Sequence, residues 1–150
     1  MIYLDHAATT PLHPGVLEAM LPFLTEHYGN PSSLHASGRR ARQGLDEARE
    51  TAARILGARP REIVFTGGGT EANNLAVLGL ARARAKLGRH ILVGATEHPC
   101  VRDAARALTA EGFELESLRL DAAGGLDLEH ALTRLRADTV LVAQMLVNNE

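Results

Sequence analysis

The chain has 150 residues, with 16 basic and 18 acidic side chains and a formal net charge of −2. Hydrophobic residues make up 45% of it and charged residues 23%, which is typical of a globular domain and argues against disorder. This near-neutral balance gives no electrostatic reason to expect nucleic acid or an anionic membrane surface as a partner.

The location and the metal content can be predicted from three further features. No apolar run approaches the roughly 18 residues that span a bilayer, and the N-terminus lacks the basic and then hydrophobic pattern of a secretory signal. Cys100 is the only cysteine, which excludes an internal disulfide and a multi-cysteine zinc site. The histidines show no paired ligand spacing, so we expect no metal site. The lack of an apolar span and of a secretory signal leads us to expect a cytoplasmic protein.

The first third of the chain predicts two helices. Apolar positions in residues 16–27 fit one helical face, and Pro11 and Pro14 are expected to stop any earlier element. A loop dense in turn formers follows at residues 29–33, and a second amphipathic helix is predicted over residues 38–56.

From residue 62 onward, strands and helices alternate. Short apolar runs alternate with helical patterns, which predicts an α/β fold with a mostly parallel sheet covered by helices on both faces. The expected strands are residues 62–66, 90–94, 113–120 and 139–147, and the expected helices are residues 70–87, a helix after Pro99, and residues 127–136.

The last predicted strand bears on the completeness of the chain. Residues 139–147 are uniformly apolar, which predicts a central strand. Ligands in such sheets collect beyond the carboxyl ends of the strands. The chain stops at that point, with Asn148, Asn149 and Glu150, so we expect a fragment of a larger protein.

A glycine run between a predicted strand and a predicted helix is the strongest local signal. Gly67-Gly68-Gly69 lets the backbone approach a ligand closely, and the free N–H groups at a helix start bind anions. Thr70 can cap the helix or give its hydroxyl to a phosphate. The alternative is a strand-to-helix connection without a ligand.

The nucleotide sites that use glycine loops fit poorly. A P-loop places Lys and Ser/Thr after the glycines, whereas Thr70 and Glu71 stand here, which disfavours ATP or GTP. The run does match the loose dinucleotide pattern G-x-G-x-x-A. However, Gly94 stands where that fold would want an acid at the end of the next strand.

Polar residues follow two other predicted strands. His98 can stack on an aromatic ligand or move a proton near neutral pH, or it can be a turn histidine bonded to backbone. Asn148 and Asn149 can donate to a phenolate-like oxygen or cap a turn. Cys100 follows a proline at a helix start, a position that can activate a thiol, but single cysteines are more often packing residues.

Taken together and in order, five sequence blocks resemble the cysteine desulfurases. These are pyridoxal 5'-phosphate (PLP) enzymes of the class V aminotransferase group with fold type I. The resemblance covers essentially the whole chain and is closest to the nitrogen-fixation and iron–sulfur-assembly branch. The blocks are residues 3–11 (YLDHAATTP), 29–33 (GNPSS), 63–74 (IVFTGGGTEANN), 96–98 (TEH) and 147–150 (VNNE).

The resemblance implies a role for four residues of this chain. Gly69 and Thr70 match positions that bind the PLP phosphate. His98 matches the histidine that stacks over the pyridine ring and assists proton transfer, which makes it the expected catalytic residue. Asn149 matches the asparagine that hydrogen-bonds the phenolic oxygen of the ring.

The resemblance also implies a domain division and a reaction. Residues 1–15 would enter a small domain, and residues 16–150 would form the first part of the PLP-binding large domain. The family converts L-cysteine to L-alanine and leaves the sulfur as a persulfide on an enzyme cysteine. The sulfur then passes to an iron–sulfur scaffold or another acceptor protein, for iron–sulfur cluster or thio-cofactor assembly, and the enzymes are homodimers.

The chain departs from the family in what it lacks. The family's PLP-bearing lysine and catalytic cysteine come later than residue 150. The only lysine, Lys86, lies sixteen residues beyond Thr70, about 24 Å away along a helix at ~1.5 Å per residue, too far to reach the cofactor. We therefore predict that residues 1–150 alone are inactive.

Other functions remain open at this point. A selenocysteine lyase or another class V relative would share the same motifs, and substrate preference would separate them. A non-catalytic domain that binds a phosphorylated ligand or partner is an alternative of a different class. A dinucleotide-binding domain is the weakest, because of Gly94.

Overall fold

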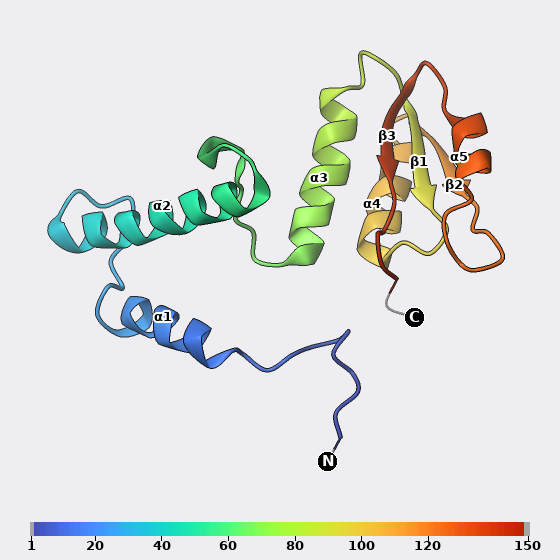
Figure 1. Ribbon diagram of the computed structural model, residues 1–150. Helices are drawn as coiled ribbons and strands as arrows, with labels where there is room; N and C mark the ends of the chain where they lie inside the picture. The colour runs from blue at the N-terminus through green and yellow to red at the C-terminus, as the bar shows by residue number, and fades with distance from the viewer. Residues whose placement is uncertain (1, 149–150) are drawn as a thin grey trace. The chain divides into compact units, whose positions relative to one another are not determined.

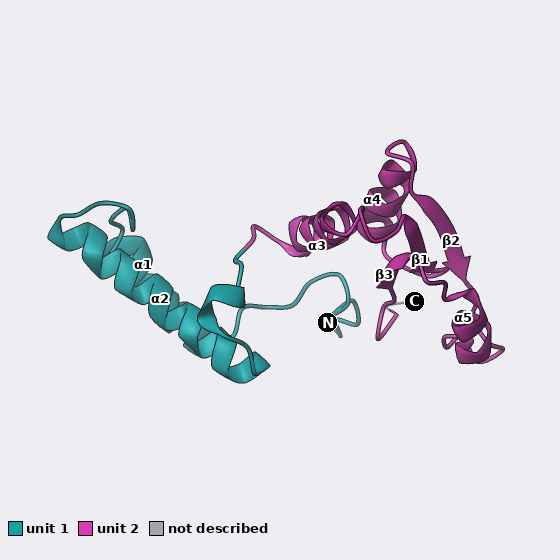
Figure 2. Cartoon of the chain, turned by 90° about the horizontal axis from the view of Figure 1, so that it is seen from above, with its two compact units in different colours: residues 1–65 teal, residues 66–150 magenta. Residues whose placement is uncertain are grey.

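The computed structural model describes residues 2–148, which fall into two compact units divided between Phe65 and Thr66 (Figure 2). No helix in this part of the chain is long and apolar enough to cross a membrane. The expected domain division, at residues 1–15 and 16–150, concerns a larger protein and stays a prediction.

The first unit contains helices α1 (Pro14–Thr25) and α2 (Ala36–Leu56) and the short 3₁₀ helix η1 (Pro60–Glu62). Pro14 opens α1 instead of stopping an element, because a first-turn residue needs no N–H and the proline φ angle already suits a helix. Gly57 ends α2 in the left-handed region, at φ 65°.

The two long helices meet where Phe23 of α1 lies on Gly44 of α2. A Cβ atom added to Gly44 would stand 2.3 Å from Phe23 Cε1, so this approach requires a glycine. The apolar faces predicted for both helices are not buried. They line an open groove of about 830 Å³, and Met20, Leu24 and Ile55 keep 45%, 65% and 76% of their surface exposed.

The strand predicted over residues 62–66 is wrong. Glu62 ends η1, and residues 63–66 are irregular, with Val64 65% exposed. A strand exists only through backbone hydrogen bonds to a neighbour. Within residues 2–148 no strand pairs with this segment, although its Ile-Val-Phe composition suits one.

The second unit is an α/β domain with a parallel three-stranded sheet in the order β2-β1-β3 (Figure 1). This confirms the predicted α/β fold with a parallel sheet. The strands are β1 (His90–Gly94), β2 (Glu114–Leu118) and β3 (Thr139–Ala143), and the helices are α3 (Gly69–Ala83), α4 (Pro99–Thr109) and α5 (Leu128–Arg134).

Helices pack on both faces of the sheet because successive side chains of β1 point in opposite directions. Ile91 and Val93 face a core shared with α3 and α4. Leu92 faces the other side of the sheet, where it packs with Leu118 of β2 and Ala131 of α5. Every residue of β1 is buried. The apolar residues of α4 that face this core are all buried, namely Val101, Ala104, Ala105 and Leu108.

Strand β3 differs from the prediction in length and place. It ends at Ala143 and lies at one edge of the sheet, and β1 is the central strand. Val142 is 47% exposed and Val147 79% exposed. An edge strand can be as apolar as a central one in sequence, so composition did not distinguish the two positions.

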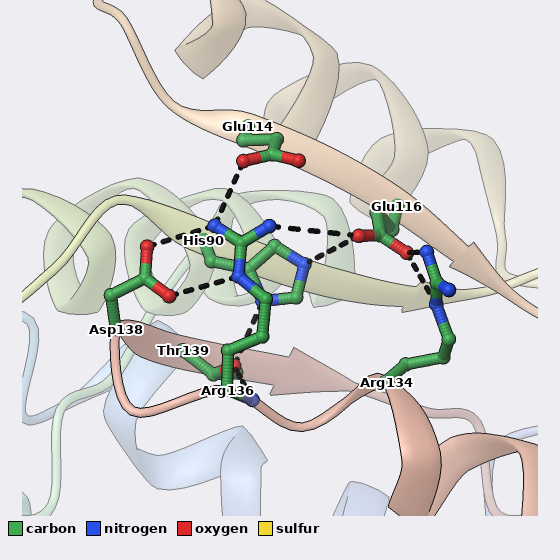
Figure 3. A network of polar contacts seen from close by, with 7 residues as sticks. All are labelled: His90, Glu114, Glu116, Arg134, Arg136, Asp138 and Thr139. Carbon is green, nitrogen blue, oxygen red and sulfur yellow. Dashed lines mark hydrogen bonds and ion pairs between the residues drawn. The ribbon is translucent and has the colours of Figure 1, made fainter.

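An ionic network closes the edge of the sheet where the strands begin (Figure 3). Buried His90 contacts the Thr139 hydroxyl through Nδ1 at 2.8 Å and lies 3.3 Å from Glu116 through Nε2. Arg134 pairs with Glu116, and Arg136 contacts Glu114 and Asp138.

Candidate functional site

The predicted phosphate loop lies at the start of α3. Gly68 is the N-cap, and Gly69 and Thr70 are the first two helical residues. No side chain caps this helix start, and among residues 2–148 no acceptor bonds the N–H groups of Gly69 and Thr70. Such N–H groups, together with the helix dipole, favour an anion.

The space around the loop fits a phosphate. A Cβ atom added to Gly68 or Gly69 would meet nothing within 4 Å. The Gly67 N–H is already used, because it donates to the Glu71 carboxylate at 2.6 Å, so a phosphate would rely on the N–H groups of Gly69 and Thr70. The donors and the open surface therefore suit the phosphate group of a cofactor such as PLP.

His98 lies at the start of α4, the second helix start of the candidate site. It is the N-cap of α4, and its Nδ1 accepts the backbone N–H of Cys100 at 3.2 Å. The backbone-bonded histidine weighed in the sequence analysis is thus present. This bond uses only one ring nitrogen, and the side chain is exposed, so His98 can still meet a ligand.

Two asparagines of α3 connect the two helix starts. Asn74 Nδ2 donates to the carbonyl oxygens of Thr70 at 2.8 Å and Cys100 at 3.4 Å. Asn73 Nδ2 donates to Cys100 Sγ at 3.3 Å, and that sulfur lies 2.9 Å from His98 Nδ1. The structure therefore joins the predicted phosphate loop to the predicted catalytic histidine.

Two cavities, of about 430 Å³ and about 380 Å³, have His98 and Glu97 in their walls. Glu97 is 6% exposed, and its Oε1 has no hydrogen-bond partner in the described part of the chain. Gln144 lies against Gly94, where an added Cβ would stand 2.5 Å from its Oε1. Gly94 itself carries no acid for a dinucleotide ribose, which disfavours that alternative.

The last predicted site residue, Asn149, lies outside the described residues. Its neighbour Asn148 donates to the Thr96 carbonyl oxygen at 3.0 Å, which joins the segment after β3 to the loop after β1. Lys86 lies three residues beyond the end of α3, in a turn at the end remote from Thr70. No group of side chains in residues 2–148 could hold a metal ion.

Sequence reasoning missed the linking role of Asn73 and Asn74. A signal was present, because asparagine is a poor helix former and its side chain competes for backbone hydrogen bonds. Two of them in the second turn of a helix indicate polar partners for their amides. Cys100 packs beside the core, as a packing residue would, but its sulfur also has two polar contacts.

The fold and the site define a class of protein: an α/β domain whose exposed helix start suits a phosphate, with an imidazole on the adjoining helix start. The class-V aminotransferase family profile matches residues 2–150, and the chain belongs to this family.

Named relatives are cysteine desulfurases. The chain is 47% identical to "Cysteine desulfurase IscS" of Dictyoglomus turgidum over 149 residues, which are 99% of this chain and 38% of that protein. A solved "NIFS-like protein" superposes with a TM-score of 0.94 at 37% identity, over 99% of this chain and 41% of that one. A structure of "SspA in complex with cysteine" superposes with a TM-score of 0.90 at 39% identity, over 99% of this chain and 43% of that one. The chain thus spans about two fifths of these proteins.

Proposed function

We propose that this chain is the N-terminal part of a PLP-dependent cysteine desulfurase. The complete enzyme would convert L-cysteine to L-alanine and leave the sulfur as a persulfide on a cysteine of its own. The observation that carries the proposal is the link between Thr70 and His98, made by Asn73, Asn74 and Cys100. The named relatives support the substrate and the reaction.

The residues of this chain would bind and orient the cofactor. The N–H groups of Gly69 and Thr70 would hold the PLP phosphate, and the His98 ring would stack over the pyridine ring. Asn149 would donate its amide to the phenolic oxygen. PLP, when bound, supplies an electron sink for bonds at the α-carbon of an amino acid. His98 would move a proton to or from the substrate.

Residues outside this chain would complete the site. The only lysine, Lys86, follows a helix of fifteen residues, about 22 Å long at ~1.5 Å per residue, that begins at the phosphate loop. The PLP-bearing lysine and the catalytic cysteine would therefore come from the part of the relatives' length that this chain does not span. We expect residues 1–150 alone to be inactive.

The setting of the enzyme is part of the proposal. It would be a cytoplasmic homodimer that passes its sulfur to an iron–sulfur scaffold or another acceptor protein, for cluster or thio-cofactor assembly. The iron–sulfur role is supported by the likeness to a "NIFS-like protein" and to an IscS desulfurase.

Reconstitution tests the proposed function. The chain is mixed with the complementary C-terminal part of the protein and with PLP, and alanine is measured after L-cysteine or L-selenocysteine is added. We expect alanine from L-cysteine only when both parts are present. Turnover of L-selenocysteine alone would indicate a selenocysteine lyase. No turnover and no PLP binding by the mixture would favour a non-catalytic phosphate-binding domain.

A further inference from the structure

Hydrogen-bonding groups converge on His98 Nδ1 from Cys100. The backbone N–H of Cys100 donates to Nδ1 at 3.2 Å, and Cys100 Sγ lies 2.9 Å from the same nitrogen. Asn73 Nδ2 donates to Sγ at 3.3 Å. The thiol therefore lies between an amide donor of α3 and the imidazole at the start of α4.

These contacts select a tautomer. A neutral imidazole carries its proton on one nitrogen and accepts only through the other. Because the Cys100 N–H needs a lone pair on Nδ1, the proton belongs on Nε2. The Cys100 S–H then shares that lone pair with the backbone N–H in a three-centre hydrogen bond, while the sulfur accepts from Asn73. The partner of one ring nitrogen fixes the state of the other.

We propose that Cys100 is a positioning residue for His98: its thiol, held by Asn73, keeps the neutral ring protonated at Nε2. His98 then meets a ligand as a hydrogen-bond and proton donor through Nε2. The inference rests on the proposed function only for the identity of that ligand. The tautomer is a property of this chain without cofactor.

Nuclear magnetic resonance of the full chain labelled with ¹⁵N-histidine tests the proposal. Spectra are recorded at about pH 8, above the ordinary histidine range near ~6.5, and His98→Gln assigns the signal. We expect Nε2–H to predominate in the wild-type chain. In Cys100→Ala the backbone donor remains but the thiol is lost. We expect about a fivefold rise in the Nδ1–H form, about 1 kcal/mol at 1.4 kcal/mol per factor of ten.

Two further variants keep the test independent of folding defects. Cys100→Ser supplies a hydroxyl donor and should restore the wild-type tautomer. Asn73→Ala changes an exposed side chain and frees the sulfur to accept from Nδ1, so a rise of the Nδ1–H form is expected there too. The signal of His90, at the far edge of the sheet, should stay unchanged in every variant.

The contrary results are specific. A wild-type chain with the His98 proton on Nδ1, or a folded Cys100→Ala chain with the wild-type spectrum, would overturn the positioning role. If the chain shows the expected tautomers but the reconstituted protein neither binds PLP nor forms alanine, only the proposed function fails. Turnover with unchanged tautomers in Cys100→Ala and Asn73→Ala would leave the function and remove the inference.

Discussion

The side-chain amide of Asn74 donates to the backbone carbonyl of Cys100 across 3.4 Å, from one helix start to the other. The same amide bonds the Thr70 carbonyl within its own helix at 2.8 Å. One half-buried asparagine thus fixes the distance between the proposed phosphate loop and the proposed catalytic histidine, two elements about 28 residues apart in the chain.

Replacing Asn74 should loosen this edge of the sheet. We expect Asn74→Ala to lower the free energy of unfolding by about 1–2 kcal/mol, because two carbonyl groups lose a donor. Urea unfolding measures the change. The control is Gln43→Ala on α2, whose amide accepts from Arg40 and donates to Glu47 on an exposed face and should cost less than about 0.5 kcal/mol. Equal losses in both variants would contradict the linking role.

Thr70 is proposed to bind the cofactor phosphate. In the reconstituted enzyme, Thr70→Val should weaken PLP retention roughly 10- to 100-fold, the effect of one lost hydrogen bond to a charged group. Retention is measured by dialysis followed by phosphate and cofactor assay. Val64→Thr, a change at an exposed residue before the loop, serves as the control. Unaltered retention in Thr70→Val would remove its hydroxyl from the site.

The glycines of the second unit differ in what they tolerate. A Cβ at Gly88 would stand 2.1 Å from the backbone oxygen of Asp138, so Gly88→Ala should destabilise the chain by about 1–3 kcal/mol. Gly79 lies on α3 with nothing within 4 Å of an added Cβ, and Gly79→Ala should stabilise by about 0.5–1 kcal/mol. Thermal unfolding compares the two; a stable Gly88→Ala variant would contradict the packing described here.

The ionic network at the far edge predicts a pH dependence of stability. The hydrogen bond from Arg134 holds the pKa of Glu116 below its ordinary value of 4.5. A carboxyl whose folded pKa is lowered stabilises the fold above its unfolded pKa, and this contribution disappears as the pH falls through the folded value. Glu116→Gln should therefore be less stable than wild type near neutral pH.

Melting temperatures of the wild type and Glu116→Gln should converge as the pH drops below about 4.5, the ordinary glutamate value. Glu129→Gln, an exposed change on α5, is the matched control and should follow the wild-type curve throughout. A constant difference between wild type and Glu116→Gln from neutral pH to acid would mean that the ion pair with Arg134 does not set stability.

The sequence predicted some elements well for physical reasons. β1 and α4 carry their own signals, an unbroken apolar run and an apolar stripe at helical spacing, and both are buried where expected. The helix predicted over residues 127–136 begins at its N-cap Asp127, which accepts the His130 N–H at 2.9 Å. Local patterns suffice where an element finds its partners nearby.

Other features could not be read from local patterns. Whether Val64 lies in a strand depends on a partner strand from another part of the chain, and the edge position of β3 depends on the order of the whole sheet. In the structure Gly69 and Thr70 begin α3, His98 caps α4, and side-chain contacts join the two helix starts. The asparagines that connect them were not predicted, because a side-chain bond across two helices leaves no periodic signal.

The central claim is that the start of α3 captures the phosphate of PLP beside His98. The most direct measurement is the titration of PLP into the ¹⁵N-labelled chain, with pyridoxal, which lacks the phosphate, as the control. We predict that PLP shifts the amide signals of Gly69 and Thr70 and the ring signal of His98, whereas pyridoxal leaves the two amides unmoved. Unmoved Gly69 and Thr70 signals at saturating PLP, or equal shifts with pyridoxal, would contradict it.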